Sequence, residues 1–120
     1  MIIFGHPWVK HEPLYRIRNR EEIHTTPPNS LLKIEQFDIE LLQYCHANQL
    51  AYMVTIENIK EGIFGNIYQA KYLRCSKKLA TELMPIAQNY LFDSRILAII
   101  DHEEEIEEMA KANVDGVWFR

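Results

Sequence analysis

Three side chains in this sequence have the chemistry needed for acid–base catalysis or metal binding near neutral pH: His6, Asp101 and His102. Histidine titrates close to pH 7 and is a frequent metal ligand. His6 and His102 lie far apart in the chain, and neither an HxH nor an HExxH spacing occurs. These residues are therefore candidate catalytic groups only through the position that the predicted fold gives them, and no metal site is predicted.

Ser76 and Lys77 form a candidate anion site, because they stand where a predicted strand gives way to a predicted helix. The free amides and the positive dipole end of a helix N-terminus favour negative charge. The alternative interpretation is that Ser76 only caps the helix, a common role for serine, while Lys77 is solvated. Neither GxGxxG nor GxxxxGK[ST] occurs, so we expect no standard nucleotide site and predict no cofactor.

The most unusual local sequence is Gly5-His6-Pro7-Trp8. A tryptophan beside a rigid proline is suited to wall a ligand pocket or to anchor a partner, since tryptophan is enriched in interface hot spots. Trp8 could equally cover the end of the core, because large aromatic side chains are often partly buried. The sequence leaves both roles open.

The elements that must position these residues alternate between strand and helix. Apolar strands are predicted to start near residues 31, 51, 71, 95 and 116, which matches the length of one strand–loop–helix–loop unit. Amphipathic helices are predicted between them, over about 38–48, 57–69 and 77–91 and after residue 101. Pro85 is expected to kink or split the third helix, and Asp101 is expected to cap the last, with Glu104 completing a capping box.

The first 30 residues are less regular than residues 31–120. They hold a short strand at 2–4, a second strand at 13–17 that its leading proline places at a sheet edge, and a short helix at 20–25. No linker separates this segment, so we predict a single α/β domain over residues 1–120.

Strands joined by such crossovers form parallel neighbours with right-handed connections. We predict a mostly parallel sheet of five or six strands with helices on both faces, a flavodoxin-like or Rossmann-like three-layer sandwich. The alternative is half of a (β/α)8 barrel completed by a second copy. In either case ligands are expected beyond the carboxyl ends of the strands, which adds Glu35, Thr55 and Glu57 to the candidates and brings His6 and Trp8 to the same rim.

Residues 96–119 resemble the late helix–strand units of (β/α)8 barrels such as the glycerophosphodiester phosphodiesterases. The resemblance is carried by the strand at 96–100, by the acidic run Glu103-Glu104-Glu105, and by Val114-Asp115-Gly116-Val117. It covers about a fifth of the chain. The His-Arg-Gly signature of that family is missing from the early strands, so the resemblance implies strand–helix alternation and no activity.

Composition narrows the function classes. The formal net charge of −4 argues against nucleic-acid binding, which needs a basic surface to displace counterions. No apolar run reaches the length of a membrane helix, and no targeting signal is recognised, so a cytoplasmic location is expected. The leading hypothesis is a non-catalytic binding or self-association module, including a homodimer or a protein partner. The alternative is a small enzyme or ligand-binding protein whose carboxyl-end site binds an anionic or phosphorylated small molecule.

Overall fold

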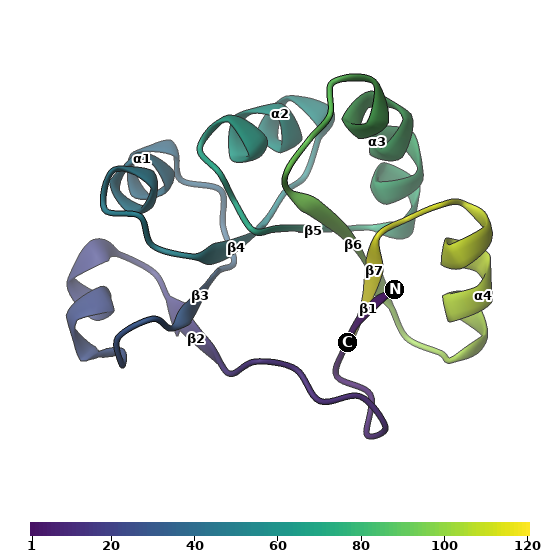
Figure 1. The fold of residues 1–120 in the computed structure, drawn as a ribbon, viewed down its shortest axis with the longest axis horizontal. Coiled ribbons are helices and arrows are strands. Elements are labelled where there is room, and N and C mark those ends of the chain that lie inside the picture. Colours follow the sequence, from purple (N-terminus) through teal and green to yellow (C-terminus); the bar gives the residue numbers. More distant parts are fainter.

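Seven parallel strands form one curled sheet in the computed structural model, which describes all 120 residues (Figure 1). The strand order is β1-β7-β6-β5-β4-β3-β2. The strands are β1 (Ile2–Phe4), β2 (Leu14–Ile17), β3 (Leu31–Ile34), β4 (Tyr52–Thr55), β5 (Tyr72–Cys75), β6 (Arg95–Ile100) and β7 (Gly116–Phe119). The helices are the 3-10 helix η1 (Arg20–Thr25) and the α-helices α1 (Ile39–Ala47), α2 (Ile59–Ile67), α3 (Lys77–Asn89) and α4 (Glu104–Lys111).

The sheet confirms the parallel α/β prediction and corrects its strand count. The predicted number was five or six, and the seventh strand is β2, which pairs with β3 at one edge as its leading proline suggested. β1 forms the opposite edge through its pairing with β7. The sheet curls without closing, because β1 and β2 do not pair with each other.

All the helices lie on the convex side of the curve, so the prediction of helices on both faces is wrong (Figure 1). From β2 to β7 each strand lies next to the one that follows it in sequence. Right-handed crossovers that always step in the same direction place every helix on the same face. A three-layer sandwich requires the strand order to reverse partway. The structure therefore fits the half-barrel alternative.

The two faces of the sheet are buried in different ways. On the convex face, Val54, Leu73 and Ile96 pack against the helices in a cluster of 23 buried residues. On the concave face, Met53 and Leu97 belong to a separate cluster of five, and both are fully buried without any helix above them. Other inward-facing side chains cover the concave face instead.

Polar side chains cap three of the α-helices, two of them as predicted and one, Asn58, without having been predicted. Asp38, Asn58 and Ser76 each accept a hydrogen bond from a backbone N–H of the first turn. The expected cap at Asp101 is wrong, because α4 begins at Glu104 with Glu103 in helical geometry before it and no side-chain cap. Glu104 consequently forms no capping box.

Helix α3 runs unbroken through Pro85, so of the two predicted effects of this proline, a kink or a split, the split is wrong. The neighbours of Pro85 hold the helix in place: Leu83, Met84 and Ala87 are all buried against the sheet.

No helix of the structure combines the length and apolar character needed to cross a membrane.

The four α-helices end in the same way. Gln49, Gln69, Leu91 and Asn113 all have φ between +54° and +61°, the left-handed region. The residue after each of them donates its N–H to a carbonyl five residues back, as Phe92 does to Ala87. This is the Schellman pattern, in which glycine is the usual left-handed residue. None of the four is glycine, so each helix end carries backbone strain.

Replacing the most exposed of these residues tests that strain. Leu91 is 83% exposed and has a φ of +54°. We expect Leu91→Gly to raise the free energy of unfolding by roughly 1 kcal/mol, since glycine adopts this conformation without steric cost. Leu91→Ala, which keeps the strain and removes the side chain, is the matched control and should not stabilise. Equal effects of both substitutions in denaturant unfolding would show that the side chain, rather than φ, matters.

Candidate functional site

A group of polar side chains lies on the concave face toward the carboxyl ends of the strands. We call it the concave cluster, and its members are Arg16, Lys33, Glu35, Thr55, Arg74 and Trp118. They come from five different strands or their carboxyl ends. The sheet register sets Arg16 beside Lys33 and Thr55 beside Arg74. Alternation along each strand turns these side chains inward while residues such as Leu73 face the helices.

Arg74 is the central cation of the cluster. Its Nε and Nη2 donate to the Thr55 hydroxyl at 3.0 and 2.7 Å, and its guanidinium carbon lies 4.7 Å from the centre of the Trp118 ring. It takes part in none of the protein's ion pairs. Burial lowers the pKa of Arg74 from its ordinary value, and the charge of Glu35 partly opposes that shift. The result is a partly buried guanidinium with no carboxylate in contact.

Thr55 is oriented by this contact. Its hydroxyl oxygen accepts two N–H groups from Arg74. A hydroxyl has two acceptor lone pairs and one O–H donor. Both lone pairs are therefore engaged, and the O–H remains available to donate to a ligand.

Lys33 and Arg16 surround the one carboxylate of the cluster. Lys33 Nζ lies 3.1 Å from Glu35 Oε1 and 4.6 Å from the centre of the Trp118 ring, and Arg16 Nη1 lies 3.6 Å from Glu35 Oε2. The hydrogen bond from Lys33 lowers the pKa of Glu35 most, and the charges of Arg16 and Arg74 add to this effect. Glu35 is thus ionised at neutral pH. Three cations and one carboxylate leave two positive charges uncompensated.

Pockets flank the concave cluster at the carboxyl ends of the strands. A pocket of about 270 Å³ is lined by Arg16 and Glu35, at the ends of β2 and β3. A second, of about 330 Å³, is lined by Thr55, Glu57 and Ser76 at the ends of β4 and β5. Open space therefore adjoins Arg16, Glu35 and Thr55, and the other three members of the cluster line neither pocket.

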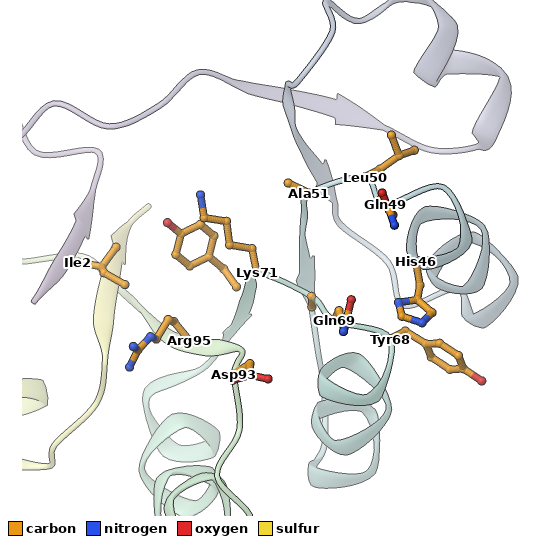
Figure 2. Close-up of a pocket in the computed structure, with 12 residues that line it drawn as sticks. Ile2, His46, Gln49, Leu50, Ala51, Tyr68, Gln69, Lys71, Asp93 and Arg95 are labelled. Carbon is orange, nitrogen blue, oxygen red and sulfur yellow. The ribbon is translucent and has the colours of Figure 1, made fainter.

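The largest pocket, of about 710 Å³, lies at the opposite, amino-terminal ends of the strands (Figure 2). Lys71 and Arg95 enter it from the starts of β5 and β6. Lys71 is paired with Glu12 at 3.0 Å, and Arg95 lies 3.8 Å from Asp115. The two cations of this pocket therefore have carboxylate neighbours, whereas Arg74 has none. For this reason we place the candidate site at the carboxyl ends of the strands, although the pockets there are smaller.

The three candidate catalytic residues do not come together. His6 Nε2 hydrogen-bonds to Glu103, and Asp101 forms a two-point pair with Arg120 at 3.1 and 3.0 Å. His102 contributes a backbone N–H to the Glu105 carboxylate. No group of three His, Cys, Asp or Glu side chains is placed to hold a metal ion.

The predicted anion site at the start of α3 is occupied by protein groups. Ser76 Oγ accepts the N–H of Leu79, which is the capping role. Lys77 pairs with Glu105 at 2.9 Å and with Glu108 at 3.1 Å. Glu57 lines the pocket beside them without an ion pair.

Trp8 is 87% exposed, so it does not cover the end of the core. Its backbone N–H donates to His6 Nδ1 at 3.1 Å, and its ring packs edge-on against the imidazole at 5.2 Å. Because the ring of Trp8 is exposed, its role as an anchor for a partner stays a prediction.

Sequence reasoning placed Glu35 and Thr55 at the carboxyl rim but missed Arg16, Lys33, Arg74 and Trp118. A signal was present, because Lys33 stands between Leu32 and Ile34 within an otherwise apolar strand. Arg74 lies likewise between Leu73 and Cys75. A charged residue in a buried strand marks a polar patch on the opposite face.

Cys75, the neighbour of Arg74, is no nucleophile for this site. It is free and buried on the helix-facing side, and burial raises the pKa of its thiol to about 12. Cys45, the other free cysteine, is buried in the same cluster, and its pKa is raised to about 11 for the same reason.

Comparison with known proteins supports the fold alone. No family model matches the sequence, and a search of curated proteins found no match. Among solved structures the protein is similar to one titled "Native KDPGal structure", with a TM-score of 0.59 and 13% sequence identity. The match covers 75% of this chain and 46% of that chain, so this chain spans less than half of that protein. The similarity agrees with the barrel-like resemblance seen in the sequence.

The carboxylate of Glu105, at the carboxyl-end rim, is expected to make the stability of the protein depend on pH. Lys77 and the backbone N–H groups of Asp101 and His102 bind this carboxylate and lower its pKa from the ordinary 4.5 to about 2. The unfolded chain therefore takes up a proton more readily than the folded one in this range. We expect this part of the stability to be complete above about pH 5 and to be lost as the pH falls toward 2.

Acid unfolding of two variants checks this expectation. Glu105→Gln should lower stability at pH 7 and flatten its decline between about pH 5 and 2. Glu107→Gln alters a carboxylate on the same helix that forms no ion pair, and it should keep the native pH profile. Identical profiles for the native protein and Glu105→Gln would contradict the prediction.

Proposed function

We propose that the protein binds a small anion at the concave cluster. The proposal rests on the state of Arg74. Its guanidinium is partly buried, has no carboxylate partner, and makes no protein hydrogen bond through Nη1. A buried charge is costly unless an opposite charge and hydrogen bonds compensate it. A bound anion would supply both.

The surrounding groups suit the same ligand. Arginine binds carboxylate or phosphate through two parallel hydrogen bonds. Lys33 adds a second cation whose side chain is only 17% exposed, and the free O–H of Thr55 adds a neutral donor. The place also agrees with the rule that ligands of parallel barrels bind at the carboxyl ends of the strands. The proposal is one of binding and assigns no catalytic step.

Amide chemical-shift titration with inorganic phosphate tests the site. We expect saturable shifts at Thr55, Arg74 and Trp118. Arg74→Met should weaken binding by roughly tenfold or more, because hydrogen bonds to charged groups are the strong ones. Arg95→Met removes an equal charge from the opposite end of the sheet and should change the affinity less than about twofold.

Thermal unfolding checks that each variant is folded. Arg74→Lys is a second variant, which keeps the positive charge but cannot form two parallel hydrogen bonds to the anion. It should bind phosphate with intermediate affinity. An unchanged affinity in Arg74→Met, or shifts confined to the amino-terminal pocket, would overturn the proposal.

A second candidate function is self-association through α2. Ile63, Phe64 and Ile67 on this helix are 38%, 41% and 53% exposed, which leaves an apolar strip on the convex surface. Such strips often mark protein contacts. If this strip joins two copies, the native protein should sediment as a dimer at micromolar concentration and Phe64→Asp as a monomer. A native monomer at all concentrations would rule this function out.

A further inference from the structure

We propose that the anion bound at the concave cluster is a phosphate monoester whose carbon skeleton carries hydroxyl groups. This inference rests on the proposed function and specifies its ligand. It follows from the charge of the cluster, from the state of Glu35 and from the size of the adjoining pocket.

The charge of the cluster matches a dianion. Arg16, Lys33 and Arg74 face a single carboxylate, Glu35, so two positive charges have no partner among these side chains. A phosphate monoester carries a charge of about −1.5 to −2 at pH 7. A monocarboxylate would compensate only half of that excess.

Glu35 offers hydrogen-bond acceptors to a ligand. It is ionised and 42% exposed, and its protein partners are Lys33 on one oxygen and Arg16, at 3.6 Å, on the other. An ionised carboxylate offers about four acceptor positions. Acceptors therefore remain open beside the proposed phosphate position, and a phosphate group alone would meet repulsion there.

Hydroxyl groups fit these acceptors better than an ammonium group does. A ligand ammonium would approach Glu35 through the field of Arg16, Lys33 and Arg74, in which positive charge already exceeds negative. A neutral hydroxyl donates its proton to Glu35 without that repulsion. The cluster thus favours a hydroxylated phosphate over a zwitterionic amino acid.

The space beside the cluster suits a small molecule. The pocket at Arg16 and Glu35 measures about 270 Å³, whereas the pocket at Thr55 is also lined by the carboxylates of Glu57, Asp101 and Glu105, which disfavour a phosphate. Drug-sized ligands occupy pockets of roughly 300–1,000 Å³. The pocket at Arg16 and Glu35 lies just below that range, which suits a molecule as small as a short polyol phosphate.

The test compares glycerol 1-phosphate with propyl phosphate, which has the same phosphate and carbon chain without the hydroxyl groups. Inorganic phosphate, glycerol and alanine complete the set of probes. By calorimetry or amide-shift titration, we expect glycerol 1-phosphate to bind about tenfold more tightly than propyl phosphate. Glycerol and alanine should bind at least tenfold more weakly than either phosphate ester.

Substitutions assign that preference to Glu35. In Glu35→Ala the ratio of the two affinities should fall toward one, while propyl phosphate binds no more weakly than to the native protein because a repelling charge is gone. Glu35→Gln preserves the shape of the side chain and is therefore less disruptive to folding. It should also reduce the ratio of the two affinities. Glu57→Ala, which alters a carboxylate of the neighbouring pocket, should leave the ratio unchanged.

The outcomes separate this inference from the proposed function. Equal binding of the two esters, tighter binding of alanine, or loss of the ratio in Glu57→Ala rather than in Glu35→Ala would overturn the ligand assignment and leave the anion site standing. Absence of binding by every phosphate probe would overturn both.

Discussion

The direction in which the chain steps across the sheet controls the rest of this structure. Strands β2 to β7 are added one after another in the same direction across the sheet, and crossovers between parallel strands are right-handed as a rule. Every helix therefore lies on the convex face (Figure 1). The concave face receives no helix, and inward-pointing side chains must both fill it and form any site that it holds.

The concave face divides into an apolar part and a charged part. Met53 and Leu97 are fully buried in the middle of the sheet, and the cations lie toward the carboxyl ends. Trp118 connects the two parts, since its ring packs near Phe4 at 5.6 Å and near both Lys33 and Arg74. Arg74 is held there against an aromatic ring and a hydroxyl without a carboxylate in contact, and the proposed anion site rests on this arrangement.

Local sequence signals predicted most elements and some of their ends. Serine, aspartate and asparagine caps start three helices, because short polar side chains bind the free amides there. The misses have physical causes. The Asp101 carboxylate binds Arg120 instead of capping α4, and α3 continues through Pro85 with Leu83, Met84 and Ala87 buried on its inner face.

The alternation of strand and helix, the parallel α/β class and the carboxyl-end rim that holds Glu35 and Thr55 were all predictable from the amino-acid sequence. These properties depend on periodicity and on neighbours along the chain. The folded chain shows what local patterns could not: β2 to β7 follow one another across the sheet without a reversal, so the helices share one face. Folding also brought Arg74 and Trp118 together from β5 and β7, because contacts between distant strands depend on curvature and register, which no local pattern encodes.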